Sequence, residues 1–139
     1  MRIRRLITIA STLTLVLVIA SFGMSSIKRR TETTSCRKTM SSNGIAALLW
    51  ANDNNQKTFP DSLVQLSNEI GSTRILICPG DHSRQPASSW TTLTSSNCSY
   101  EILHPNLLAT DPTNAFLRCK IHGHLGYTDS RVVDGVAPR

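Results

Sequence analysis

The stretch CRKTMSSNGIAALLWAND, residues 36–53, decides the fold. Its apolar residues recur at the spacing of an amphipathic helix of about four turns: Cys36, Met40, Ala47 and Trp50, with Leu48 and Ala51 beside them. Gly44 weakens the middle of this helix. The following residues, NDNNQK, end it because Asn and Asp favour turns. We expect the apolar face to pack against the remainder of the chain.

The rest of the chain reads as short elements of mixed type. A second helix is predicted over residues 61–71, with Asp61 as its N-cap. Strands are predicted over 74–79, 98–103 and 115–121, and a hairpin over 124–134 that turns at Asp129-Ser130. Residues 80–97 read as a long loop with Trp90 as its apolar anchor. This order predicts an α+β fold, in which a helix packs on a small antiparallel sheet.

The N-terminal segment LITIASTLTLVLVIASFGM, Leu6 to Met24, is uncharged and long enough to cross a membrane as a helix. It can act as an uncleaved anchor, or as a signal peptide cut after Ala20 or Gly23. Its length favours the anchor. The sequence thus predicts a membrane segment over 1–24, a juxtamembrane connector over 25–35 and a domain over 36–139. The expected location is the cell membrane, single-pass, with the C-terminal domain extracytoplasmic.

The formal net charge of +6 does not indicate a nucleic-acid partner. Basic residues are concentrated in the first 38 positions, on both flanks of the apolar segment, whereas acids and bases nearly balance in the rest of the chain. A phosphate-binding surface would need its basic residues on the folded domain. We therefore expect no nucleic-acid partner.

The four cysteines, Cys36, Cys78, Cys98 and Cys119, are widely spaced and form no C-x-x-C pair. In an exported protein an even number favours disulfides, and four cysteines allow three connectivities. A less favoured interpretation is a zinc site made by Cys78, Cys119, His122 and His124, whose C-x₂-H-x-H spacing is not that of a common finger. We accordingly predict no cofactor.

Enzymatic chemistry has little support in the sequence. Cys119 and His122 are near each other, but a strand-to-turn segment does not obviously bring thiol and imidazole together as a catalytic pair needs. The chain contains no Gly-x-Ser-x-Gly, no H-E-x-x-H and no glycine-rich phosphate loop after a strand. We expect a non-enzymatic protein, with a small zinc-binding or Cys/His enzyme domain as the alternative of another class.

Several motifs occur in an order that resembles the pseudopilin-like proteins related to the type II secretion major pseudopilin. The resemblance covers residues 36–133 and rests on four stretches: CRKTMSSNGIAALLWANDNNQKTFP, ILICPGD (75–81), SSNCSYEIL (95–103) and CKIHGHLGYTDSRVV (119–133). Its specific parts are the W-A-N-D-N…F-P stretch, the C-P-x-D box and the terminal H-G hairpin, taken in this order. A typical prepilin cleavage motif is absent, since Arg5 precedes Leu6 and no acid follows in residues 6–10.

This resemblance implies a pilin-like architecture, with an N-terminal helix whose second half packs on a small antiparallel sheet. It also implies a Cys78–Cys119 disulfide, with Cys36–Cys98 as a second pair. The implied function is a membrane-anchored structural component of an extracytoplasmic assembly such as type II secretion. The implied partners are the membrane and other pilin-like subunits or secretion-system proteins. The alternative is a secreted or periplasmic domain of the same fold, released by signal peptidase.

Overall fold

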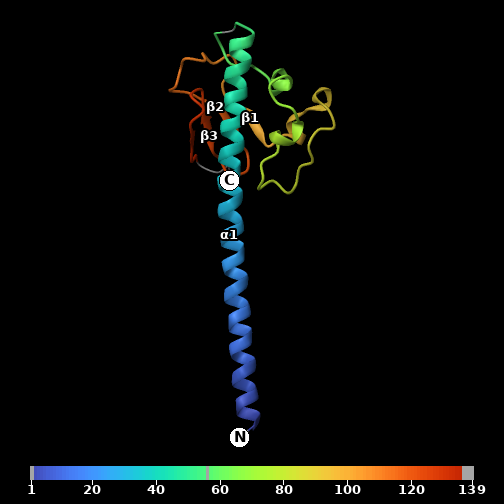
Figure 1. Ribbon diagram of the computed structural model, residues 1–139, viewed down its shortest axis with the longest axis vertical. Helices are drawn as coiled ribbons and strands as arrows, with labels where there is room; N and C mark the ends of the chain where they lie inside the picture. Colours follow the sequence, from blue (N-terminus) through green and yellow to red (C-terminus); the bar gives the residue numbers. More distant parts are fainter. Residues whose placement is uncertain (1, 56, 136–139) are drawn as a thin grey trace. The chain divides into compact units, whose positions relative to one another are not determined.

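The computed structural model describes residues 2–55 and 57–135, with side chains from residue 23 onward. The chain divides into two compact units, one that ends at Glu32 and one that begins at Thr33. The helix α1 (Arg2–Asp53) contributes residues to both units, and every other element belongs to the second (Figure 1). Residues 25–35, predicted as a connector, are therefore helical and continue α1.

The expected membrane location is not borne out. Among the residues that the structure describes, no helix is long and apolar enough to cross a membrane. From Gly23 onward α1 carries charged residues, including Lys28, Arg29 and Arg30, that interrupt any apolar run. This finding contradicts the predicted single-pass location in the cell membrane. The structure describes no side chains before residue 23, so most of the predicted segment Leu6–Met24 lies outside the side chains that it describes.

The second unit contains a four-stranded antiparallel sheet in the order β1-β2-β3-β4. The strands are β1 (Tyr100–Ile102), β2 (Ala115–Cys119), β3 (Leu125–Tyr127) and β4 (Val132–Val133). They confirm the strands predicted over 98–103 and 115–121 and the terminal hairpin. Ser130 takes a left-handed backbone conformation (φ 62°) between β3 and β4, where the turn was predicted. The α+β class is confirmed.

The apolar face of α1 packs on this sheet, as its periodicity predicts. Cys36, Met40 and Ala47 are buried, and the Met40 methyl group lies against Gly126 of β3, where an added Cβ would stand 3.4 Å away. Leu48 and Trp50, which were expected in the core, are only partly buried. The same turns of the helix bury Asn43 instead. The helix thus turns Met40, Asn43 and two alanines, Ala46 and Ala47, rather than Trp50, into the core.

Short 3₁₀ helices fill the chain between α1 and the sheet: η1 (Leu63–Ser67), η2 (Thr73–Leu76), η3 (Trp90–Thr92) and η4 (Ser95–Asn97). The helix predicted over 61–71 is therefore reduced to η1, and its N-cap is Ser62 rather than Asp61. Ser62 and Gln65 form a reciprocal capping box. Leu66 and Ile70 are buried as the periodicity predicts.

The strand predicted over residues 74–79 is wrong. Residues Thr73–Leu76 form η2, which begins after Ser72 because the Ser72 hydroxyl accepts a hydrogen bond from the Arg74 N–H. Ile77 is extended, and the segment reaches β1 through a bond from the Ser99 N–H to the Leu76 carbonyl at 2.9 Å. The apolar residues of this stretch are buried but do not pair as a strand. A short apolar run in a sequence does not distinguish a strand from another kind of buried segment.

Candidate metal centre

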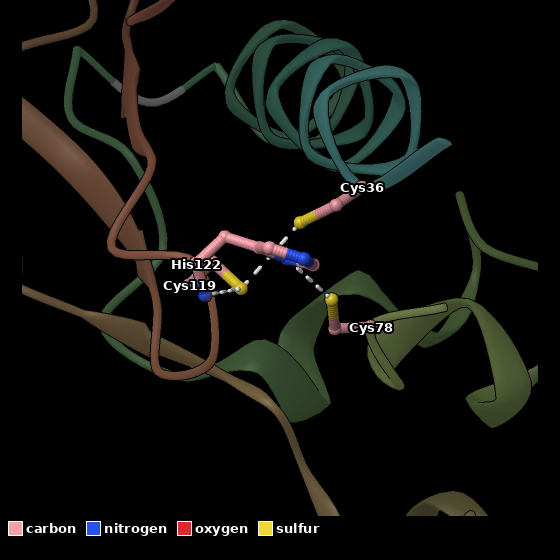
Figure 2. Close-up of side chains that lie close together, drawn as sticks. All are labelled: Cys36, Cys78, Cys119 and His122. Atoms are coloured by element: carbon pink, nitrogen blue, oxygen red, sulfur yellow. Dashed lines mark hydrogen bonds between the residues drawn. The ribbon is translucent and has the colours of Figure 1, made fainter. Parts of the chain in front are cut away.

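Three cysteines and one histidine bring their ligand atoms together in the second unit, as Figure 2 shows. The Sγ atoms of Cys36, Cys78 and Cys119 and a ring nitrogen of His122 all lie within 4.8 Å of one another. Cys36 Sγ is 3.4 Å from Cys119 Sγ, and Cys78 Sγ is 3.2 Å from His122 Nδ1. The three cysteines are fully buried, and His122 is partly buried.

The four side chains come from three separate parts of the fold. Cys36 lies on the sheet-facing side of α1, one turn before Met40. Cys78 follows η2 in the C-P-G turn, and Cys119 is the last residue of β2. His122 lies in the turn between β2 and β3, which Gly123 closes with a left-handed backbone (φ 71°) and a hydrogen bond from its N–H to the Cys119 carbonyl. The cluster therefore joins helix, loop and sheet.

Backbone N–H groups point at two of the sulfur atoms. Cys78 Sγ accepts a hydrogen bond from the backbone of Gly80. Cys119 Sγ accepts from the backbone of Ile121 and from the His122 N–H at 3.4 Å. Hydrogen bonds of this kind favour the thiolate over the thiol, since the charged sulfur is the stronger acceptor.

The three thiols influence one another's protonation. Hydrogen bonds from Cys36 and then Cys78 lower the pKa of Cys119 to about 2, in spite of its burial. The hydrogen bond with Cys119 raises the pKa of Cys36 above its ordinary value, and the same contact raises the pKa of Cys78 to about 11. In this arrangement Cys36 and Cys78 both donate hydrogen bonds to the sulfur of Cys119. A bound cation would replace the thiol protons of Cys36 and Cys78, because cysteine binds metal ions as the thiolate.

Three of the four side chains suggested by the sequence lie in this cluster: Cys78, Cys119 and His122. His124 does not contribute a ligand atom. Its buried ring stacks on the His122 ring with centroids 5.3 Å apart, and its Nδ1 lies 3.0 Å from Asp134 Oδ1. The reason is Gly123, whose turn ends the alternation that would have placed both histidines on one strand face.

Sequence reasoning missed Cys36 as a member of the cluster. It is 83 residues from Cys119, and no local spacing connects the two. The position of Cys36 on the apolar face of the helix could nevertheless have indicated its place in the cluster. Cys36 opens the apolar stripe that continues through Met40, so a helix packed on the sheet must direct this thiol toward the strands.

All four cysteines are free thiols in the structure. The predicted disulfides Cys78–Cys119 and Cys36–Cys98 are therefore not formed, although Cys36, Cys78 and Cys119 are neighbours in the cluster. Cys98 is separate from them. It is buried beside β1, where its thiol contacts the backbone carbonyls of Leu76 and Tyr100 at 3.6 and 3.2 Å.

A shallow groove of about 340 Å³ lies apart from the cluster, between η1 and β1. Its two charged side chains near the strand already have partners: Glu101 pairs with Arg118, and Lys120 donates to the carbonyls of Ser95 and Cys98. In comparisons with known proteins, no protein-family model, no curated protein and no solved structure matches this chain.

Proposed function

We propose that this protein is a non-enzymatic, pseudopilin-like structural subunit that acts in an assembly of pilin-like proteins such as a type II secretion system. The observation that carries the proposal is the packing of the C-terminal part of α1 on an antiparallel sheet (Figure 1). On this part of the helix Cys36, Met40 and Ala47 are buried. A long helix that packs on a small meander is the architecture expected of a pilin-like subunit.

The chemistry of the Cys/His cluster supports a structural role. A nucleophilic cysteine needs a thiolate that a substrate can reach. Cys36, Cys78 and Cys119 are each 0% exposed, and the groove between η1 and β1 is lined by Cys98 rather than by any of them. The sulfur atoms of these three cysteines are therefore shielded from a substrate in solution.

The outer face of α1 supports a role in assembly. Ile45 and Leu49 are 50% and 49% exposed, and their i, i+4 spacing places them one above the other on the helix surface. Single exposed apolar residues are ordinary, but an adjacent pair on a helix gives a neighbouring helix an apolar stripe to pack against. In an assembly of pilin-like subunits this stripe would be covered.

Site-specific photo-crosslinking of the full chain tests the proposal. A photoreactive phenylalanine analogue at Leu49 is expected to give crosslinks to a second copy or to co-expressed pilin-like subunits. The same analogue at Asn68, an exposed position outside α1, is the control and is expected to give few. A chain that crosslinks equally weakly from both positions, and that sediments as a monomer, would contradict the proposal and favour a free domain.

A further inference from the structure

We propose that Cys36, Cys78, Cys119 and His122 bind one zinc ion, through three Sγ atoms and His122 Nδ1, and that this ion is structural. The inference is independent of any partner, because all four ligands belong to one chain. It concerns a site within the second unit alone, in which the ion would connect α1, the turn after η2 and the end of β2 (Figure 2).

The distances between the ligand atoms suit a tetrahedral ion. Zinc–sulfur bonds of about 2.3 Å place the corners of a tetrahedron about 3.8 Å apart. The Cys36–Cys119 and Cys78–His122 separations of 3.4 and 3.2 Å are slightly shorter, and no ligand pair exceeds 4.8 Å. Side-chain shifts of a few tenths of an ångström to about 1 Å would bring all four atoms to bonding distance of one point.

The donor set favours zinc over the hard divalent ions calcium and magnesium. Three sulfurs and one imidazole are ligands for zinc and other soft or borderline metals, whereas calcium and magnesium require oxygen. All four positions of a tetrahedron are taken by protein atoms, which leaves none for water or substrate and marks a structural rather than a catalytic ion. The backbone N–H groups at Cys78 and Cys119 offset part of the negative charge that three thiolates bring.

A Cys36–Cys119 disulfide is the competing state of the same residues. Their sulfurs are 3.4 Å apart, so a modest approach would bring them to the bond length of about 2.05 Å. Forming the S–S bond releases the two thiol protons and transfers two electrons to an external oxidant. It also removes Cys36 and Cys119 from the set of four zinc ligands. The disulfide would account for only two of the four clustered residues and would not explain why Cys78 and His122 lie beside them. A zinc ion would use all four.

Metal analysis of the purified full chain tests the site. The expected result is one zinc ion per chain, and four thiols per chain once the protein is denatured in a chelator. Cys36→Ser and His122→Ala are expected to reduce the zinc content to background. Cys98→Ala and His104→Ala, which change a buried cysteine and an exposed histidine outside the cluster, are expected to retain it. A wild-type chain that contains no metal and only two titratable thiols would overturn the proposal in favour of the disulfide.

Cobalt substitution covers the case in which a ligand variant fails to fold. Wild-type protein refolded with Co²⁺ is expected to show the intense visible bands of a tetrahedral ion and thiolate-to-cobalt charge transfer in the near ultraviolet. His122→Cys keeps four ligands and is expected to bind Co²⁺ with stronger charge transfer, because a thiolate replaces the imidazole. Weak octahedral bands from the wild type, or an unchanged spectrum in His122→Cys, would overturn the assignment of these ligands.

Discussion

Asp81 is the residue on which the turn after Cys78 depends. Its carboxylate is buried and accepts hydrogen bonds from Ser99 Oγ at 2.6 Å, Ser83 Oγ at 2.7 Å and Arg84 Nη1 at 2.6 Å. Burial alone would raise the pKa of Asp81, but these hydrogen bonds outweigh it and hold the pKa well below the ordinary 3.8. The turn that carries Cys78 is thereby tied to β1 through Ser99.

We expect Asp81→Asn to lower the free energy of unfolding by about 3 kcal/mol at pH 7, since the amide keeps one oxygen but loses the charge that Ser99 and Arg84 contact. A carboxyl whose folded pKa is depressed stabilises the fold above its unfolded pKa, and this contribution is lost as the pH falls below about 4. Urea denaturation of both proteins from pH 7 to pH 2 should therefore show a difference in stability that is constant above about pH 5 and narrows steadily as the pH falls toward the depressed pKa of Asp81.

The matched control for this substitution is Asp111→Asn. Asp81 accepts hydrogen bonds from the N–H and the hydroxyl of Ser83. Asp111 accepts the equivalent pair from the N–H and the hydroxyl of Thr113, at 2.8 and 2.5 Å, but at the surface. Its replacement should change stability much less than that of Asp81. Equal losses at the two positions, or a difference between wild type and Asp81→Asn that does not narrow between pH 5 and pH 2, would contradict the role assigned to the buried carboxylate.

Gly44 was expected only to weaken α1, but it also adjoins the β3–β4 turn. A Cβ at this position would stand 3.4 Å from Ser130 Cα, which is an ordinary contact. Gly44→Ala should raise the free energy of unfolding by about 0.5–1 kcal/mol, because alanine is the better helix former and still fits. Gly44→Leu should lower it, since the longer side chain meets the turn. Thermal denaturation measures both, and Gly23→Leu, with no atom within 4 Å of its added Cβ, serves as the control that should not be destabilised.

Among the elements, the helix α1 has Met40 as its largest fully buried side chain. Met40 is 1% exposed and contacts β3 at Gly126, whereas Trp50 is only partly buried at the edge of the core. Met40→Ala should cost about 2–5 kcal/mol through lost burial and the cavity it leaves. Trp50→Ala should cost less, although Trp50 is the larger residue. Leu49→Ala changes an exposed position on the same helix and is the control for helix propensity. If Met40→Ala had the same melting temperature as Leu49→Ala, the packing of Met40 against the sheet would be disproved.

At the same scale, periodicity and turn chemistry were enough to locate the helix over 36–53 and three of the predicted strand regions. They failed at residues 74–79, where burial of Leu76 and Cys78 produces an apolar run without a strand. They also failed for Cys36 in the Cys/His cluster. Local patterns place each ligand on its element, but which ligands meet depends on how a helix and a sheet far apart in sequence are packed.

On the scale of the whole second unit, the core is small and its segments are distant in sequence. Cys78 and His122 are 44 residues apart, and Cys36 and Cys119 are 83 apart. A domain of about a hundred residues has only a modest core, and a metal ion that closes such long loops stabilises the fold by restricting the unfolded chain. The ion would act between α1 and β2, where the helix first meets the sheet.

We therefore expect chelation of the ion to loosen the second unit as a whole rather than at one loop. Treatment of the full chain with a zinc chelator should lower Tm by at least about 10 °C, since a loss of a few kcal/mol in a domain of this size shifts Tm by about 4–8 °C per kcal/mol. Hydrogen exchange should rise together in α1 from Cys36 to Ala51, in the turn after Cys78 and in β2. Cys98→Ala should show the same chelator response as the wild type, because its thiol lies outside the cluster. An unchanged Tm, or faster exchange confined to the turn at His122, would show that the ion does not hold the helix to the sheet.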